Sequence, residues 1–384
     1  KDLDFRIAFS KRLIDAKIRN QIVVMRRYAR HGNYNVERSV VEMQNMYKKL
    51  ENAKNAEEQI SAYKKIMKYD DHVATIFTVI SIRYSLDTTN EEYVKANDVL
   101  DEIAPQVQVF SDKINKILVS SPFRKELEEE FGPYLFKQID MALKCFDPKI
   151  IEDLQLENKL VSKYNKVMAS AKIKFEGGVY NLSQMGKFTT DVDRERRKKA
   201  SKAVAKFFEK HHEEIGQIYD DLVHTRDNMA KKLGFKNYVE LGYMRLGRCD
   251  YNAEMVANYR KQVEKVLVPV WKKLYKRQMK RIHIRNPRFY DMGLNFLSGN
   301  PTPIGNPEYL VNKANEMYHE MSKETGAFFE YMVDNHMMDL IAKPGKQGGG
   351  YMTYLPEYKC PFIFSNFNGT SGDVDVLTHE FGHA

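Results

Sequence analysis

The chain contains little cysteine, tryptophan or proline. Its 384 residues include 3 cysteines, 1 tryptophan and 12 prolines. The cysteines (Cys145, Cys249 and Cys360) lie far apart and form no CxxC pair. The sequence therefore predicts neither a disulfide framework nor a cysteine zinc site, and a reducing, cytoplasmic setting fits best.

Long apolar runs, repeats and low-complexity segments are also absent. No stretch reaches the roughly 18 apolar residues that a membrane-spanning helix needs, so we expect no membrane partner. Two triplets match the glycosylation pattern, Asn181-Leu182-Ser183 and Asn368-Gly369-Thr370. We interpret both as accidental, because no secretory signal precedes them.

Positive charge exceeds negative charge, with 61 Lys and Arg against 52 Asp and Glu, a formal net charge of +9. The basic runs over residues 194–199 and 271–288 are interleaved with apolar residues at helical spacing. They carry no RNA-binding aromatic motif. The pattern predicts solvated helix faces and no nucleic-acid partner.

The first 340 residues show mainly helical periodicity. Thr88 and Glu91 form a capping-box pattern ahead of an apolar stripe, and Pro105 is expected to kink or interrupt that helix. A further stripe includes Phe207 and His211. We interpret His211 as a boundary residue of an amphipathic helix, and the same reading holds for the other histidines without a partner at ligand spacing, namely His212, His224, His283, His319 and His336.

The periodicity changes towards the end of the chain. Residues 286–306 form a proline-rich loop, and Asn306 with Pro307 begins a new helix. Two aromatic-rich runs, residues 350–354 and 362–367, are predicted to be strands joined by residues 356–359. Three glycines open the first strand, and a bound peptide could add there as an extra strand, or the glycines could serve only as a flexible entry.

The motif HEFGH at residues 379–383 carries the chemistry. On a helix, His379 and His383 lie about 40° apart, so both imidazoles can reach one zinc ion. Glu380 lies beside the open coordination position and is predicted to be the general base. Phe381 falls on the opposite side and is expected to pack in the core.

Residues before the motif support a helical setting. Residues 368–373 carry a turn signal, and Thr370 with the acidic Asp373 three positions later predicts the start of a helix. Asp375 lies four residues before His379, so its carboxylate could fix the tautomer of that imidazole. An ordinary acidic residue near a helix N-terminus explains Asp375 equally well.

Three blocks together resemble a known family: GKQGGGY at 345–351, PFIFSNFNGT at 361–370 and DVDVLTHEFGHA at 373–384. They are similar to the signature block of the oligoendopeptidase F group within the M3 family of zinc metallopeptidases. Weaker similarity extends upstream through LDTT at 86–89, MAKKLGF at 229–235 and YVELGY at 238–243.

The resemblance implies a mainly α, two-lobed metallopeptidase with a deep channel and a small β-hairpin or sheet beside the zinc helix. We expect an N-terminal helical lobe over residues 1–175 and an M3-like catalytic domain over residues 176–384. The resemblance also implies that zinc is bound by His379 and His383, with Glu380 as the base, and that short unfolded peptides are the substrates. Gly349, Gly350, Tyr351 and Met352 are the predicted substrate-binding residues.

In the resembled family a glutamate on a later helix is the third zinc ligand, and no residue up to Ala384 matches it. We therefore expect the C-terminal remainder of the same enzyme as a partner, because a catalytic zinc needs three protein ligands. Two alternatives stay open. One is a helical HExxH carboxypeptidase or dipeptidyl carboxypeptidase, and the other is a non-catalytic peptide-binding fragment.

Overall fold

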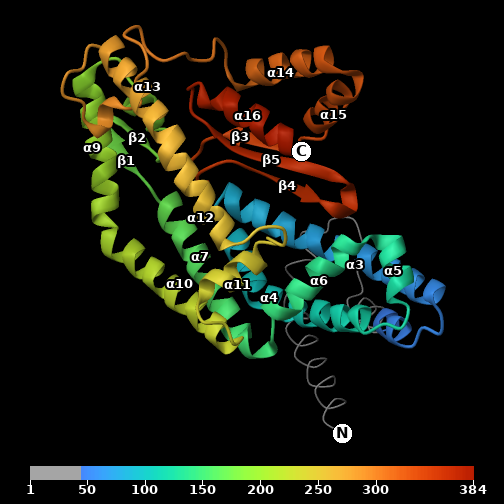
Figure 1. The fold of residues 1–384 in the computed structure, drawn as a ribbon. Helices are drawn as coiled ribbons and strands as arrows, with labels where there is room; N and C mark the ends of the chain where they lie inside the picture. Colours follow the sequence, from blue (N-terminus) through green and yellow to red (C-terminus); the bar gives the residue numbers. More distant parts are fainter. Residues whose placement is uncertain (1–44) are drawn as a thin grey trace. The chain divides into compact units, whose positions relative to one another are not determined.

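The computed structural model describes residues 45–384. These residues form a mainly helical protein, as the sequence predicts, and they include two small sheets (Figure 1). Residues 45–51 are helical. The longer helices are α3 (Ala56–Leu86), α4 (Glu91–Val119), α5 (Arg124–Phe131), α6 (Pro133–Cys145), α7 (Ile151–Ala169), α9 (Arg194–Lys210), α10 (His212–Lys232), α11 (Tyr238–Arg245), α12 (Ala253–Gln262), α13 (Val268–Arg281), α14 (Pro307–Met321), α15 (Lys323–Asp334) and α16 (Gly372–His383).

Short elements connect these helices. They are η1 (Pro148–Ile150), α8 (Gly186–Thr189), the π-helical turn η2 (Val263–Leu267), η3 (Phe289–Asp291) and η4 (Pro356–Tyr358). Among the described residues, no helix is long and apolar enough to cross a membrane.

The chain divides into two compact units. Among the described residues, unit 1 comprises residues 45–80, Glu91–Gln155 and Met229–Cys249, and unit 2 comprises Ser81–Asn90, Leu156–Asn228 and Asp250–Ala384. Residue 175, at the expected domain boundary, lies inside unit 2. The assignment of a catalytic domain to residues 176–384 stays a prediction.

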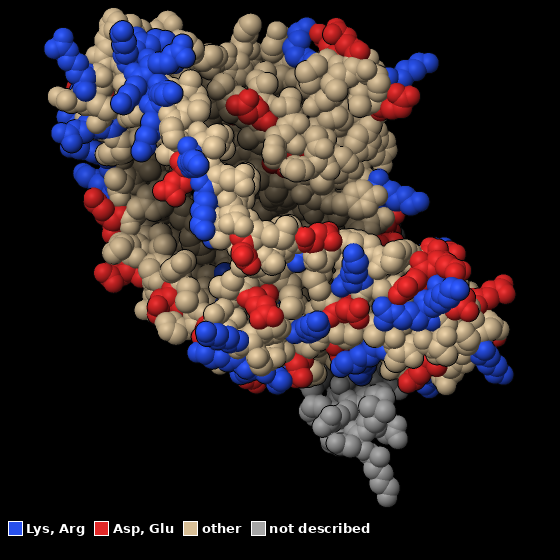
Figure 2. Space-filling model, in the orientation of Figure 1, with Lys and Arg blue, Asp and Glu red and all other residues tan. Residues whose placement is uncertain are grey.

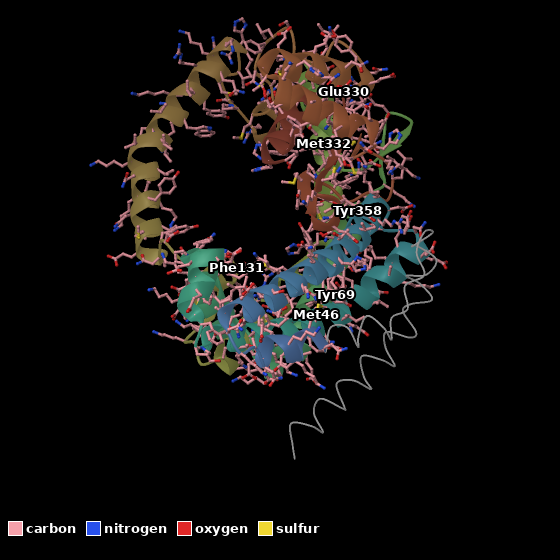
Figure 3. The ribbon with its side chains drawn as sticks, turned by 90° about the vertical axis from the view of Figure 1, so that its right-hand side faces the viewer. Met46, Tyr69, Phe131, Glu330, Met332 and Tyr358 are labelled. Carbon is pink, nitrogen blue, oxygen red and sulfur yellow. The ribbon has the colours of Figure 1, made fainter. Side chains whose placement is uncertain are left out.

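Unit 1 has two apolar clusters. In the first, Leu50, Leu118 and Leu127 are fully buried, and Met46 and Phe131 pack against them (Figure 3). The second joins the end of α6 and the start of α7 to α10 and α11, through Cys145, Phe146, Ile150, Leu154, Met229, Ala230 and Leu241. Unit 1 therefore holds cores of its own.

Unit 2 contains the three-stranded sheet, ordered β3 (Met338–Ile341), β5 (Cys360–Phe367) and β4 (Tyr351–Leu355). β4 and β5 are antiparallel, as the sequence predicts, and η4 joins them. β3 pairs with β5 in parallel and was not predicted, because its partner lies more than 20 residues away. β4 is therefore an edge strand.

A second, two-stranded sheet also escaped prediction. β1 (Ile173–Phe175) and β2 (Gly178–Tyr180) form an antiparallel hairpin in unit 2. The two turn residues, Glu176 and Gly177, both have positive φ, as the type I′ turn of a two-residue hairpin requires.

A large cluster beneath the three-stranded sheet fixes α16. It combines buried residues of α14, α15, β3, β5 and α16, namely Ala314, Tyr318, Phe329, Met332, Leu340, Ile363, Phe367, Leu377 and Phe381. Met332 is fully buried there, whereas Glu330 on the same helix is exposed (Figure 3). The burial of Phe381 confirms its predicted place in the core.

Several helix boundaries differ from the predictions. The capping box at Thr88 is wrong, because α4 begins at Glu91 and the Thr88 hydroxyl donates to the carbonyl of Gly345. Pro105 does not interrupt α4. His211 ends α9 and separates it from α10, so its stripe is not one helix. The cap at Asn306 is confirmed, because its side chain accepts the N–H of Tyr309.

Candidate metal centre

The turn before α16 sets the start of the helix. The carboxylate of Asp373 accepts the N–H groups of Asn368 at 2.9 Å and Gly369 at 2.8 Å. Burial raises the pKa of Asp373, and these two bonds oppose that rise. The N-cap position is Ser371, one residue later than the predicted Thr370.

His379 and His383 lie one helical turn apart on the exposed side of α16. Their Nε2 atoms are 3.1 Å apart, and their rings are nearly perpendicular, with an interplanar angle of 87°. Two nitrogens bound to one tetrahedral zinc at about 2.0–2.1 Å lie about 3.3 Å apart. The two histidines therefore fit a shared zinc ion with little movement.

Glu380 lies on the protected side of the same turn. Its side chain is buried, in contrast to the two histidines. Across from it stands Gly350, where a Cβ atom would lie 3.6 Å from Oε1 of Glu380 and 2.9 Å from Cγ1 of Val376. Because Gly350 has no side chain, the backbone entering β4 approaches the Glu380 carboxylate closely.

The predicted substrate-binding residues lie at this strand edge. Gly349 has a φ of +89°, and its carbonyl accepts from the side chain of Asn366 at 2.8 Å. Met352 packs against the cluster that contains Phe381. The structure thus brings Gly350 to Glu380, and it leaves the backbone of β4 at the edge of the sheet.

Tyr351 is held from two sides. Its ring stacks on Phe364 with centroids 4.7 Å apart, and its hydroxyl is 2.6 Å from the hydroxyl of Ser85. Burial raises the pKa of Tyr351 to about 12. The side chain therefore serves as an anchor for β4, and a role in binding substrate through its backbone stays a prediction.

Asp375 is exposed, one turn before His379. Its backbone carbonyl accepts from Thr378. In the part of the chain that the structure describes, no hydrogen bond joins its carboxylate to His379. Its supporting role stays a prediction.

The other histidines lie apart from this pair. His211 approaches Glu214 at 3.2 Å, His224 approaches Asp220 at 3.4 Å, and His319 approaches Glu330 at 3.7 Å. Within residues 45–384, no group of three His, Cys, Asp or Glu side chains is arranged to hold a metal. The pair His379 and His383 stays the predicted metal site, and all three cysteines are free of disulfide bonds.

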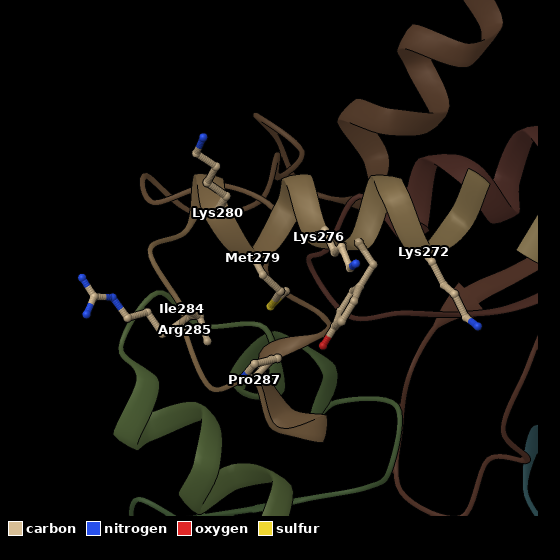
Figure 4. A pocket seen from close by; sticks show the side chains of 8 residues that line it. Lys272, Lys276, Met279, Lys280, Ile284, Arg285 and Pro287 are labelled. Carbon is tan, nitrogen blue, oxygen red and sulfur yellow. The ribbon is translucent and has the colours of Figure 1, made fainter. Parts of the chain in front are cut away.

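A hollow of about 540 Å³ lies elsewhere in unit 2, along α13. Its lining residues are Lys272, Tyr275, Lys276, Met279, Lys280, Ile284, Arg285 and Pro287. Lys272, Lys280 and Arg285 point in different directions (Figure 4), so these charges do not converge on one ligand. The hollow contains none of the HExxH residues.

The basic runs differ in their environment. On the face shown in Figure 2, Lys and Arg gather near the end of α13, and those side chains are exposed, as predicted. The prediction is wrong for Arg197 in the other run, which is only 1% exposed. Its guanidinium donates to Asp291 at 3.0 Å, because η3 folds back against α9.

Two family models match parts of the chain. A model of the peptidase M3 N-terminal domain matches residues 32–146, and a model of peptidase family M3 matches residues 304–384. A comparison with curated proteins gave no significant match.

Solved structures show the likeness over most of the chain. PZ peptidase A with inhibitor 2 is 49% identical with a TM-score of 0.90, over 92% of this chain and 63% of that one. A structure from Bacillus anthracis named for oligoendopeptidase F is 47% identical with a TM-score of 0.89, over 92% of this chain and 65% of that one. Another oligoendopeptidase F structure is 47% identical with a TM-score of 0.90, over 92% of this chain and 63% of that one.

The mainly helical fold and these matches together show the family of the chain. This chain belongs to peptidase family M3 and is similar to oligoendopeptidase F. The chain spans 63% to 65% of the length of the three solved relatives.

Proposed function

We propose that this chain carries the zinc-binding helix of a metalloendopeptidase that hydrolyses internal bonds of short, unfolded peptides. The observation that carries the proposal is the pair of imidazole nitrogens 3.1 Å apart, with the Glu380 carboxylate held next to the edge strand. Membership of family M3 and likeness to oligoendopeptidase F support it.

The residues have separate roles in this proposal. His379 and His383 hold zinc, which makes water more acidic and polarises a carbonyl when it is bound. Glu380 takes a proton from the attacking water and passes it to the leaving amine. The backbone of β4 from Gly349 to Met352 aligns an extended peptide by main-chain hydrogen bonds, which tolerate varied side chains.

The setting that we propose is the cytoplasm. Three free cysteines, two of them buried, are compatible with a reducing compartment. We propose a third zinc ligand from polypeptide outside residues 45–384, since those residues supply two.

The substitution Glu380→Gln tests the role of the base. It keeps the shape of the side chain and removes its basicity, so we expect zinc to stay bound and turnover to fall by about 100-fold to 10,000-fold. A fluorogenic peptide blocked at both ends is the substrate, and metal analysis gives the zinc content. Glu330→Gln on α15, an exposed position, is the matched control and should keep full activity.

Three results would change the proposal. Ordinary activity of Glu380→Gln would remove that residue from the mechanism. Cleavage only of peptides with a free terminus would assign an exopeptidase, and peptide binding without any cleavage would assign a binding protein.

A separate zinc titration of Asp375→Asn tests whether the Asp375 carboxylate orients the imidazole of His379. If it does, we expect zinc binding to weaken about 10-fold to 100-fold.

A further inference from the structure

Lys346 is a buried lysine in unit 2 whose side chain is 0% exposed. Its ammonium lies 2.6 Å from the carboxylate of Asp339. Its three N–H groups are shared between that carboxylate and three backbone carbonyls, those of Asp339 at 3.0 Å, Ile341 at 3.0 Å and Ser365 at 2.5 Å. A single ammonium thus joins strand β3 to strand β5.

An irregularity in the sheet explains why donors are needed there. The register between β3 and β5 shifts between Asp339 and Ile341. Carbonyls at such a shift lose their regular ladder partners, and buried carbonyls without donors are costly. Burying a charge also costs free energy, so an apolar side chain would fill the same space at a lower cost in free energy. The ammonium supplies the donors that an apolar side chain lacks.

Lys346 also lies within the glycine-rich segment at residues 345–350, which is fastened on both sides. The carbonyl of Gly345 accepts the N–H and the hydroxyl of Thr88, both at 2.8 Å. The N–H of Gln347 donates to the carbonyl of Ser85 at 2.8 Å. On the sheet side, the amide of Asn366 donates to the carbonyls of Gln347 and Gly349, both at 2.8 Å.

The fastened segment ends at the candidate site. Gly350 follows directly and approaches Glu380, as described above. A movement of the segment by a few tenths of an ångström would therefore change the distance between the edge of β4 and the Glu380 carboxylate.

We propose that Lys346 is a positioning residue: its buried ammonium fixes the glycine-rich segment and so determines where a peptide paired with β4 meets Glu380. The proposal rests on the proposed function, in which β4 binds the peptide. Lys346 itself touches neither peptide nor metal, and it acts through residues 347–350.

The test compares Lys346→Met with Lys343→Met in the full-length protein. Lys343 also pairs with Asp339, at 3.0 Å, but its side chain is 46% exposed, so it is the matched control. For Lys346→Met we expect KM for the blocked peptide to rise about tenfold or more, because misplaced binding groups weaken binding of the peptide itself. Lys343→Met should stay within about twofold of the wild type, as an exposed pair contributes little.

The split between KM and kcat separates positioning from simple loss of structure. A variant that only unfolds in part loses active molecules, which lowers the apparent kcat and leaves KM unchanged. An unchanged KM in folded, zinc-loaded Lys346→Met would overturn the proposal. If Lys346→Met does not fold, Thr88→Val removes one bond to the same segment, and an unchanged KM in that variant would overturn it instead.

Amide hydrogen exchange makes the result independent of catalysis. We expect exchange at residues 347–352 to quicken about tenfold in Lys346→Met, with α16 unchanged, because local opening sets these rates. If the wild-type protein cleaves no peptide, the proposed function fails, and exchange alone then decides whether Lys346 holds the segment. Unchanged exchange at residues 347–352 would show that it does not.

Discussion

At the scale of single residues, the largest departure from expectation is the buried ion pair of Arg197 and Asp291. Asp291 is 0% exposed, and Arg194 donates to both of its carboxylate oxygens, at 3.0 and 2.8 Å. Arg197 also donates to the carbonyls of Asp191, Val192 and Tyr290. The two arginines therefore tie α9 to the loop that contains η3.

This pair predicts a specific dependence of stability on pH. Burial alone would raise the pKa of Asp291, but hydrogen bonds from Arg194, Arg288 and Arg197 lower it to about 2. Because the folded pKa lies below the unfolded value, the stabilisation is present above about pH 4 and is lost as the pH falls towards 2. We expect the wild type to lose about 2 kcal/mol from this group between pH 5 and pH 2.

Urea unfolding of the wild type and of Asp291→Asn across this range measures the contribution. At neutral pH the substitution should cost about 3–5 kcal/mol, because it leaves the buried Arg197 without its counter-charge. Glu195→Gln, which removes an exposed pair with Lys198, should cost less than about 1 kcal/mol. Equal pH slopes for the wild type and Asp291→Asn would contradict the assignment to Asp291.

At the scale of elements, the contact between β4 and α16 determines the shape of the candidate site. A Cβ atom at position 350 would lie 2.9 Å from Val376 and 3.4 Å from the carbonyl of Phe364. An added methyl group must therefore move the strand or the helix. Position 348 is open, with nothing within 4 Å of such an atom.

The pair Gly350→Ala and Gly348→Ala tests this contact. We expect kcat/KM of Gly350→Ala to fall about tenfold or more, because small displacements of binding and catalytic groups are expensive. Gly348→Ala should stay within about twofold, although both variants add the same methyl group to the same segment. Steady-state cleavage of the blocked peptide gives kcat/KM for both variants. An equal fall in kcat/KM would show that the conformational freedom of the backbone matters more than the approach of Gly350 to Glu380.

The elements that the sequence predicted are those with local signals. The hairpin of β4 and β5 and the helix capped by Asn306 depend on residues within a few positions of one another. The HExxH pair likewise follows from helical spacing alone. Local patterns therefore indicated where the histidine pair lies and which elements are next to it.

The elements that the sequence did not predict depend on partners far away in the chain. Thr88 has the pattern of a helix cap, yet its hydroxyl donates to Gly345, which is 257 residues away. β3 has four residues and gains its strand character from β5. A lysine in a glycine-rich segment is normally exposed, and only the register shift of the sheet explains why Lys346 is buried. No periodicity in the sequence reports these contacts.

At the scale of the whole molecule, each unit has buried clusters of its own, and the HExxH helix belongs to unit 2. A ligand that binds only the folded state stabilises the part that must be folded to bind it. Zinc should therefore protect unit 2 more than unit 1.

Amide hydrogen exchange with and without zinc checks this. At a zinc concentration about 100 times the Kd, we expect exchange in α16 and β5 to slow by up to about 100-fold, equivalent to about 2.7 kcal/mol. Amides around Leu50 and Leu118 in unit 1 should change little. His383→Ala is the control and should abolish the protection, whereas equal slowing in both units would show that they unfold together.

The hydrogen bond between Ser85 and Tyr351 spans 266 residues of sequence. At synthesis rates of about 5–20 residues per second, the ribosome needs roughly 13–50 seconds to add that length of chain. The partners of Ser85 and Thr88, which lie in residues 345–351, are therefore synthesised only after this interval. The early helices can fold while the chain grows, but the strand edge beside Glu380 can be completed only after residues 345–351 have been synthesised.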